Sequence, residues 1–262
     1  MRQMSILDSF TKYRELLNEL TMREIKQRYK QSVLGYAWVI LNPFFQMLVM
    51  AFVFSIIMRI PHLGVPYPIF LYAGLLPWTL FSNSLNAAVN ALVANAGLIT
   101  KIYFPREIFV ISTIMAKMVD FALSLTIFVV FMIYFKVAIS WNILWVVPIF
   151  AIQQLFTYGL SLFLAAANLF YRDIQYLLGL IILIWMYLTP VIYSTELFPE
   201  KYRWIFQLNP MAVIINAYRQ VVLAGGVPNL RSLAIALVLS MILLIGGYKF
   251  FKKLEGVFAD VV

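Results

Sequence analysis

Apolar positions dominate this chain, and its charged residues are confined to short segments between long charge-free stretches. These stretches cover 31–58, 60–100, 137–171, 174–195 and 232–248. A helix needs about 20 apolar residues to cross a bilayer, and the last stretch only just offers that length. The pattern excludes a soluble enzyme fold and indicates an all-α polytopic membrane protein.

Six transmembrane helices are expected from this pattern. They are predicted over 35–58, 69–95, 108–135, 142–168, 174–194 and 231–249. The first ends clearly, because an arginine, a glycine and three prolines follow it within 59–68. Composition agrees, since 63% of the 262 residues are hydrophobic and 12% are charged, about half the charged share of a soluble domain.

Residues 1–33 are predicted to form an amphipathic segment at the membrane interface. Two short helices are expected within 5–31, because Ser5 and Thr21 each precede an acidic residue by three positions, the spacing of a capping box. Apolar residues recur at three and four positions between them, and basic residues surround this stripe. A simple membrane anchor is the alternative interpretation.

The segment 195–230 is too long and too apolar for an ordinary loop. Pro199 suits the first turn of a helix, the Asn-Pro pair at 209–210 interrupts it, and two glycines at 225–226 end a second helix. Because neither piece is long enough to span the bilayer, we expect a re-entrant helical pair over about 197–225, entering from the outer face.

Lysine and arginine are unevenly divided between the two sides of the predicted membrane. With six spans both termini fall on one side, which also receives most of the chain's 20 lysine and arginine residues. Since cytoplasmic loops carry this excess, both termini are predicted to be cytoplasmic. The net charge of +9 therefore favours anionic lipid rather than nucleic acid as the binding partner. Each lysine or arginine near an anionic membrane surface contributes about 1 kcal/mol to the attraction.

Polar residues inside the predicted spans are few. Lys117 and Asp120 lie three positions apart on one helical face, where they either neutralise each other or serve as a proton relay. Asn83, Asn86 and Asn90 share a face of the second span, where they either bond to a neighbouring helix or line a water-filled path.

An aromatic stripe follows the first span, because Trp38, Phe45 and Phe52 lie seven positions apart. Such a stripe packs in a core or against lipid in most helices. Aromatic faces also suit the C–H faces of sugars, a contact that tolerates different sequences of sugar units. Both interpretations stay open from the sequence.

The chain lacks the residues of most catalytic sites. It has no cysteine and one histidine, His62, so thiolate sites and histidine metal clusters are excluded. No paired carboxylates and no serine–histidine arrangement suggest catalysis, and no GxxxxGK[ST] phosphate loop occurs. We therefore expect no metal site, no cofactor and no enzyme activity in this chain alone.

Four segments, in order along the chain, carry motifs of a known family. They read LTMREIKQRYKQSVLGYAWVILNPFFQMLVM at 20–50, NAGLITKIYFPREI at 95–108, NLFYRDIQYLLGLIILIWMYLTPVIYS at 168–194 and FQLNPMAVIINAYRQVVLAG at 206–225. Together they resemble the permease subunit of ABC exporters of the type 2 class. The resemblance points to the branch that exports lipid-linked polysaccharides, namely the O-antigen permease (Wzm-like) and its capsule and teichoic-acid relatives.

This resemblance implies two kinds of subunit. A homodimer of this chain is expected to pair with two copies of a separate ABC nucleotide-binding subunit, which holds ATP and magnesium. The amphipathic segment and the inner loops are expected to rest on that subunit. The residues expected to make the coupling contacts are Lys101, Phe104, Pro105 and Arg106 in the first loop and Arg172 and Asp173 in the second. A solvated turn is the alternative for the second loop.

The implied substrate is a polyprenyl-pyrophosphate-linked glycan in the bacterial inner membrane. A cationic corner before the first span, with free amides at the helix start, suits its pyrophosphate, and generic anchoring is the alternative. The residues expected at this corner are Lys26, Arg28, Lys30, Leu34 and Gly35. The aromatic stripe and the three asparagines are expected along the translocation path. The residues expected at the outer gate are Glu196, Glu200, Arg203 and Trp204.

Two rival functions remain at this stage. The same fold could export a drug, an antibiotic or a small lipid. A membrane enzyme acting on a polyprenyl-linked intermediate is the second rival, although it needs grouped carboxylates or histidines that the sequence does not offer.

Overall fold

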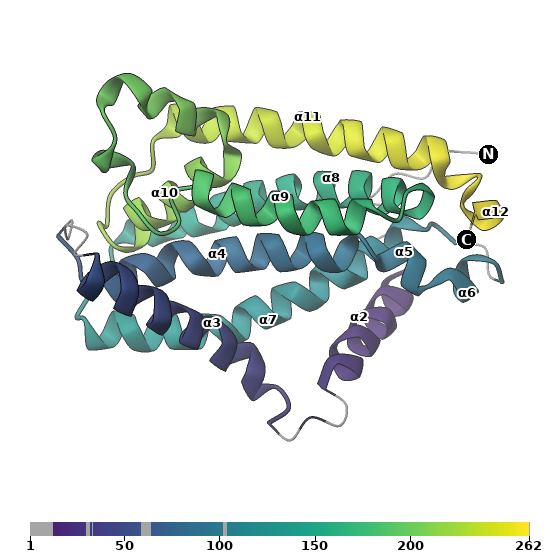
Figure 1. Cartoon of the computed structure of the whole chain (residues 1–262), viewed down its shortest axis with the longest axis horizontal. Coiled ribbons are helices and arrows are strands. Elements are labelled where there is room, and N and C mark those ends of the chain that lie inside the picture. The colour runs from purple at the N-terminus through teal and green to yellow at the C-terminus, as the bar shows by residue number, and fades with distance from the viewer. Residues whose placement is uncertain (1–12, 30–31, 33, 59–63, 102–103, 262) are drawn as a thin grey trace.

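The computed structural model describes residues 13–29, 32, 34–58, 64–101 and 104–261. Throughout this part of the chain the regular structure is helical, without a strand. The long helices lie side by side along one axis, with α4 in the middle of the bundle (Figure 1). The expected all-α polytopic architecture is confirmed at this level.

The helices follow one another in the order that the hydropathy pattern predicts. Their bounds are α2 Arg14–Tyr29, α3 Ala37–Ala51, the π-helix η1 Phe52–Ile57, α4 Tyr67–Ala88, α5 Ala91–Ala94, α6 Ala96–Ile99, α7 Glu107–Tyr134, the 3₁₀-helix η2 Trp141–Trp145, α8 Val146–Phe170, α9 Ile174–Leu188, the 3₁₀-helices η3 Thr195–Leu197 and η4 Glu200–Leu208, α10 Pro210–Val222, α11 Leu230–Glu255 and α12 Phe258–Val261.

Within the described residues, four helical segments are long and apolar enough to cross a membrane. These are Ala37–Ile57, Glu107–Tyr134, Trp141–Phe170 and Leu230–Glu255. Helix α9 is apolar but has 15 residues, and α4 has 22 residues with polar side chains in its second half. The six-span count therefore stays a prediction, with α4 and α9 as the remaining two helices.

Two helices end earlier than the sequence pattern suggests. Helix α4 ends at Ala88, and the short helix α5 lies in the rest of the predicted span to 95, with α6 after it. Asn95 donates from Nδ2 to the carbonyl of Ala91 at 2.8 Å, a side-chain bond typical of residues that favour helix ends. Helix α9 ends at Leu188, because Pro190 restricts the residue before it.

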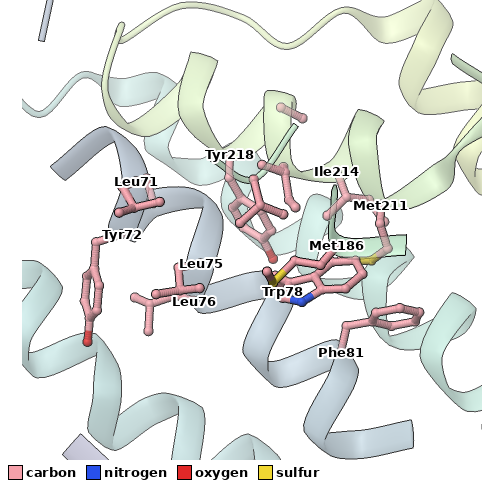
Figure 2. Close-up of a cluster of buried hydrophobic side chains, with 14 of the residues drawn as sticks. Leu71, Tyr72, Leu75, Leu76, Trp78, Phe81, Met186, Met211, Ile214 and Tyr218 are labelled. Atoms are coloured by element: carbon pink, nitrogen blue, oxygen red, sulfur yellow. The ribbon is translucent and has the colours of Figure 1, made fainter. Parts of the chain in front are cut away.

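The main core surrounds α4. Trp78 and Phe81 of α4 lie beside Met186 of α9 and Met211 and Ile214 of α10 (Figure 2). The ring of Trp185 in α9 meets the Phe81 ring edge-on, with their centres 5.2 Å apart. Helix α4 is thus enclosed by other helices rather than by lipid, which explains why its composition can be more polar than that of a lipid-facing span.

A second core joins α2 to α7. Leu17, Leu20 and Ile25 of α2 are buried at helical spacing. Thr21 lies in the same helix, where its hydroxyl donates to the carbonyl of Leu17 at 2.7 Å. The predicted second capping box at Thr21 and Glu24 is therefore wrong, because α2 continues through both residues. The first predicted box, at Ser5 and Asp8, lies outside the described residues.

The bundle has two distinct ends. Helices α5, α6 and α12 lie at one end, with α2 beside the bundle near them, and the η3–η4 segment lies at the other (Figure 1). We call them the α2 end and the η4 end. The described residues of both predicted inner loops, at about 96–106 and 169–175, fall at the α2 end, as the alternating direction of successive helices requires.

Candidate functional site

A cleft of about 710 Å³ lies between α3, α4, α7 and α9 and is the main candidate site. Helices α3 and α4 each supply more of its lining residues than α7 or α9 does. We call it the central cleft. Its polar lining consists of Asn42, Gln46, Thr79, Ser82, Asn83, Asn86, Lys117, Asp120 and Ser124.

Regular spacing brings the α3 residues to the central cleft. Trp38, Asn42 and Gln46 follow one another at four positions and therefore share one face of the helix. Pro43 lies within the same helix and has no N–H to give to the carbonyl of Val39. The Ser124 hydroxyl of α7 lies against this carbonyl, with its Oγ 3.2 Å from the Val39 oxygen and 3.0 Å from the Asp120 carbonyl oxygen of its own helix, so its one proton is shared between the two acceptors. The bond to Val39 fixes α3 against α7 beside the cleft.

The charged pair predicted on the third span lines the same cleft. Lys117 Nζ lies 3.6 Å from Asp120 Oδ2, and the two side chains are 17% and 18% exposed. Being three positions apart on one face of α7, they hold opposite charges in contact. The pair thus faces the central cleft rather than a closed protein interior.

The central cleft contains only part of the predicted translocation path. Trp38, Asn83 and Asn86 line it. Phe45 and Phe52 do not; Phe45 is exposed on α3 and Phe52 is exposed at the start of η1. Asn90 is also apart from the cleft, beyond the end of α4, where its Oδ1 lies 3.4 Å from Nδ2 of Asn168. Asn90 therefore bonds to a neighbouring helix, whereas Asn83 and Asn86 line the central cleft, and their place on a translocation path stays a prediction.

The chemistry of the central cleft suits a neutral, hydroxyl-rich ligand. The amides of Asn42, Gln46, Asn83 and Asn86 make no side-chain hydrogen bond within the described chain. Each amide offers both donors and an acceptor to a bound molecule. The Trp38 side chain, 42% exposed, adds an aromatic surface beside them. Asn42 and Gln46 were missed in the sequence, although their spacing from Trp38 was a usable signal.

The predicted coupling residues at the α2 end differ in exposure. Lys101 is exposed, whereas Phe104 is buried with its ring 5.2 Å from that of Phe109. Pro105 is half-buried. The backbone N–H of Arg106 donates to Glu255 Oε1 at 2.9 Å, and its guanidinium donates to the Glu255 carbonyl. A partner can therefore reach Lys101 directly, while the other three residues pack against the chain itself.

The second predicted coupling turn is exposed at both charged residues. Arg172 and Asp173 connect α8 to α9. Asp173 precedes α9, but its side chain caps no N–H of this helix. The buried Asn168 makes the cap instead, because its Oδ1 accepts from the N–H of Gln175 at 3.2 Å. Nδ2 of the same asparagine donates to the carbonyl of Val89 at 3.0 Å. Asn168 thus joins the ends of α4, α8 and α9.

The predicted headgroup corner lies where α2 leads into α3. Lys26 and Leu34 are exposed. Gly35 has a φ of +51°, and its N–H donates to Ser32 Oγ at 3.1 Å. Helix α3 begins at 37 without a side-chain cap. The side chain of Arg28 and the whole of Lys30 lie outside the described residues.

The predicted gate residues lie in the η3–η4 segment. Arg203 holds this segment together, donating from Nε to the Phe198 carbonyl and from a terminal nitrogen to the Glu196 carbonyl, each at 3.0 Å. Glu200 and Trp204 are exposed on η4. No residue of η4 is buried, whereas most of α10 is. The two predicted helices of the pair are thus unlike in packing.

A buried arginine at the η4 end is not among the site residues predicted from the sequence. Arg219 of α10 is 7% exposed. It donates to the carbonyls of Phe70 at 3.2 Å and Pro190 at 2.5 Å, and to that of Val191. The available signal was its place among apolar residues on a short helix. Its bonds fix α10 to α4 and to the chain after α9.

Comparison with known proteins identifies the family. The family described as ABC-2 type transporter matches residues 15–223. The chain belongs to the ABC-2 transporter family. The match begins in α2 and ends just after α10, so it takes in the central cleft and both ends of the bundle.

Curated relatives within this ABC-2 transporter group match nearly the whole chain. The O-antigen export system permease protein RfbA of Klebsiella pneumoniae is 35% identical over 250 residues, which are 95% of each chain. The protein of the same name from Myxococcus xanthus is 31% identical over 95% of this chain and 96% of its own. The polysialic acid transport protein KpsM of Escherichia coli is 24% identical over 90% and 92%.

Proposed function

We propose that this chain is the membrane permease subunit of an ATP-driven exporter that moves a lipid-linked polysaccharide of the O-antigen type across the bacterial inner membrane. The observation that carries the proposal is the 35% identity to an O-antigen export permease over 95% of both chains. The amide-rich central cleft with its aromatic wall supports a glycan rather than an apolar drug as cargo.

The proposed topology has six spans, formed by α3, α4, α7, α8, α9 and α11. At about 1.5 Å per residue the 15 residues of α9 reach only about 22 Å, and the buried residues 189–192 that follow it continue toward the outer face. The α2 end then faces the cytoplasm with both termini, and the η4 end faces outward. Helix α10 is the re-entrant part of the outer pair, and η4 lies on the surface.

In this proposal the functional unit is a homodimer, because one copy leaves large apolar faces of α3 and α9 exposed on either side of the central cleft. Val49 is exposed on α3 and Ile56 on the adjoining η1, and Leu180 and Ile184 are exposed on α9. A second copy placed across these faces encloses the two clefts in a shared path. A twofold interface of this kind uses the same surface on both copies.

The partner in the cytoplasm is proposed to be a separate ABC nucleotide-binding subunit with ATP and magnesium. The exposed side of α2, Lys101, and the turn at Arg172 and Asp173 form the surface offered to it. The pyrophosphate of the lipid carrier is proposed to enter at the corner around Lys26 and Gly35. The glycan then leaves past η4, whose exposed Glu200 and Trp204 border the exit.

The deciding experiment is co-purification with the proposed ABC nucleotide-binding subunit, followed by reconstitution in nanodiscs. Polyprenyl-pyrophosphate-linked glycan is expected to raise ATP turnover, whereas the glycan-free carrier is not. Stimulation by a drug or a short lipid alone indicates the alternative cargo. If the isolated chain modifies a lipid-linked sugar without any ATPase, the membrane-enzyme alternative is correct instead.

The homodimer has its own test, because the chain contains no cysteine. Single cysteines at Val49 and Leu180 are expected to cross-link between copies in membranes. A cysteine at Val238, equally exposed on α11, serves as the control on a face away from the central cleft. Cross-linking at Val238 alone contradicts the proposed interface.

A further inference from the structure

A cluster of four charged residues joins the start of α7 to the end of α11 at the α2 end. Glu107 is the first residue of α7 and is fully buried. Lys252 Nζ lies 2.8 Å from Glu107 Oε2 and 2.9 Å from Glu255 Oε2. Glu255 in turn accepts from the backbone N–H of Arg106 and, at its carbonyl, from the Arg106 guanidinium. We call these four residues the charge clamp.

The charge clamp satisfies two helix ends at once. The Glu255 carboxylate accepts an N–H at the start of α7, where a helix leaves its amides free and carries a partial positive charge. The Arg106 guanidinium and the Lys252 ammonium lie at the end of α11, where the carbonyls are free and the partial charge is negative. Each helix thus caps the other, so their ends are held together.

Aromatic and glycine contacts near the charge clamp connect α11 to α12 and α8. Phe258 of α12 is fully buried, with its ring 5.1 Å from that of Phe251 in α11 and 6.3 Å from that of Phe170 at the end of α8. Helix α11 also lies against α8 at Gly159 and Gly247, where backbones touch. A displacement at 104–106 therefore acts on α7 and, through the charge clamp, on α11 and α8.

A purely stabilising role is a weak explanation for the charge clamp. Burying two ions costs so much solvation that a well-packed apolar pair of similar size is often as stable. Such clusters are best understood through the geometry they impose. Here that geometry fixes the first inner loop, including Phe104 and Arg106, to a helix that begins more than a hundred residues later.

We propose that Glu107 and Lys252 are positioning residues of the exporter, which transmit the movement of the first inner loop to the α8–α11 pair. This rests on the proposed function, in which the ATPase pushes on that loop. Neither residue contacts the cargo or the nucleotide. Without the charge clamp, the first inner loop still moves with the ATPase, but α11 and α8 do not follow. ATP is then hydrolysed without export.

The test uses the complete complex with its ATPase, reconstituted in proteoliposomes with polyprenyl-pyrophosphate-linked glycan. Export per ATP hydrolysed is measured for the double variant Glu107→Met/Lys252→Met, which removes both charges of the buried pair together and leaves the Glu255 carboxylate bonded to the backbone N–H of Arg106. The ratio is expected to fall about tenfold, within the usual range of coupling between sites, while ATP hydrolysis and assembly persist. Lys253→Met is the matched control, because Lys253 is an exposed lysine at the same helix end.

The single variants Glu107→Met and Lys252→Met complete a double-mutant cycle. Because the residues act as one unit, each single change is expected to lower the ratio about as much as the pair does. A normal ratio in the double variant, or a fall equal to that of Lys253→Met, overturns the proposal. If the unmodified complex exports no glycolipid, the proposed function has failed instead, and the two results are distinguishable.

Discussion

The guanidinium of Arg219 lies 3.7 Å from the centre of the Phe70 ring, so a buried cation of α10 stacks on an aromatic residue of α4. The hydrogen bonds of Arg219 within the described chain all go to backbone carbonyls. Gly74 leaves the space for it, since a methyl group there would lie 3.0 Å from the Arg219 Cζ. One side chain thus holds the non-helical segment after α9 against α4 and α10.

Replacing Arg219 by Met is expected to destabilise the protein strongly. Several buried carbonyls lose their donor, at a cost of about 1–3 kcal/mol for each group left unsatisfied. Thermal unfolding of the purified protein in detergent measures the effect. Arg231→Met is the control, because Arg231 is exposed as the second residue of α11. Equal stability of the two variants contradicts the role given to Arg219.

Most of the helices could be predicted from the sequence, because charge-free apolar blocks leave few alternatives in a bilayer. The pattern failed where tertiary packing decides the outcome. Thr21 has the spacing of a helix start, yet α2 continues through it, since Leu17, Leu20 and Ile25 gain burial only on one unbroken helix. Helix α4 ends early at Ala88, a limit that hydropathy alone did not mark.

Gly247→Ala is expected to disturb the contact between α8 and α11. A methyl group there would collide with the backbone of Gly159, and one on Gly159 would lie 2.6 Å from the Cα of Leu244. Overpacking of this kind costs about 1–3 kcal/mol. The adjacent Gly246→Ala is the matched control, because a methyl group at Gly246 meets nothing within 4 Å. A lower melting temperature for Gly247→Ala than for Gly246→Ala is the expected result.

The site was only partly visible in the sequence, for geometric reasons. Asn83 and Asn86 reached the central cleft because they share a face of one helix. Asn90 continues the same spacing, but α4 has ended before it, so it turns toward Asn168. The pair of Glu107 and Lys252 is separated by 145 positions, and no local pattern links such residues.

Leucine at Asn83 or Asn86 is expected to lower export without changing stability. These amides line the central cleft and make no side-chain hydrogen bond within the described chain, so folding does not depend on them. Asn168→Leu is the contrasting variant. It removes the bonds to Val89 and Gln175 and is expected to lower the melting temperature. Export and melting temperature are measured on all three variants. Together they distinguish residues that line the translocation path from residues that stabilise the fold.

Unchanged export in both Asn83→Leu and Asn86→Leu, at normal protein levels, contradicts the assignment of the central cleft as the path. A fall in melting temperature for these two variants contradicts it as well, because the asparagines then serve the fold. The combined Asn83→Leu/Asn86→Leu variant sharpens the comparison, since loss of two neighbouring amides leaves a continuous apolar strip on α4.

The final prediction concerns the cationic corner before α3. Arg28→Gln/Lys30→Gln is expected to raise about tenfold or more the glycolipid concentration that half-maximally stimulates ATP turnover, because each cation near an anionic group contributes about 1 kcal/mol. The maximal turnover stays unchanged if these residues recognise the headgroup rather than drive transport. Arg14→Gln is the control, because Arg14 is an exposed cation at the other end of α2.

Generic anchoring of α2 to anionic lipid predicts a different outcome for the same variants. Every cation of the segment then contributes alike, so Arg14→Gln and either single change at the corner shift the half-maximal concentration equally, if at all. A headgroup site also responds to salt less steeply than a loose surface attraction, because contacts at close range are screened less. Gly35→Ala adds an independent measure: its φ of +51° strains any residue with a side chain, while nothing lies within 4 Å to clash. A weakened response to glycolipid in Gly35→Ala, with normal protein levels, therefore follows only if the backbone at the corner contacts the headgroup.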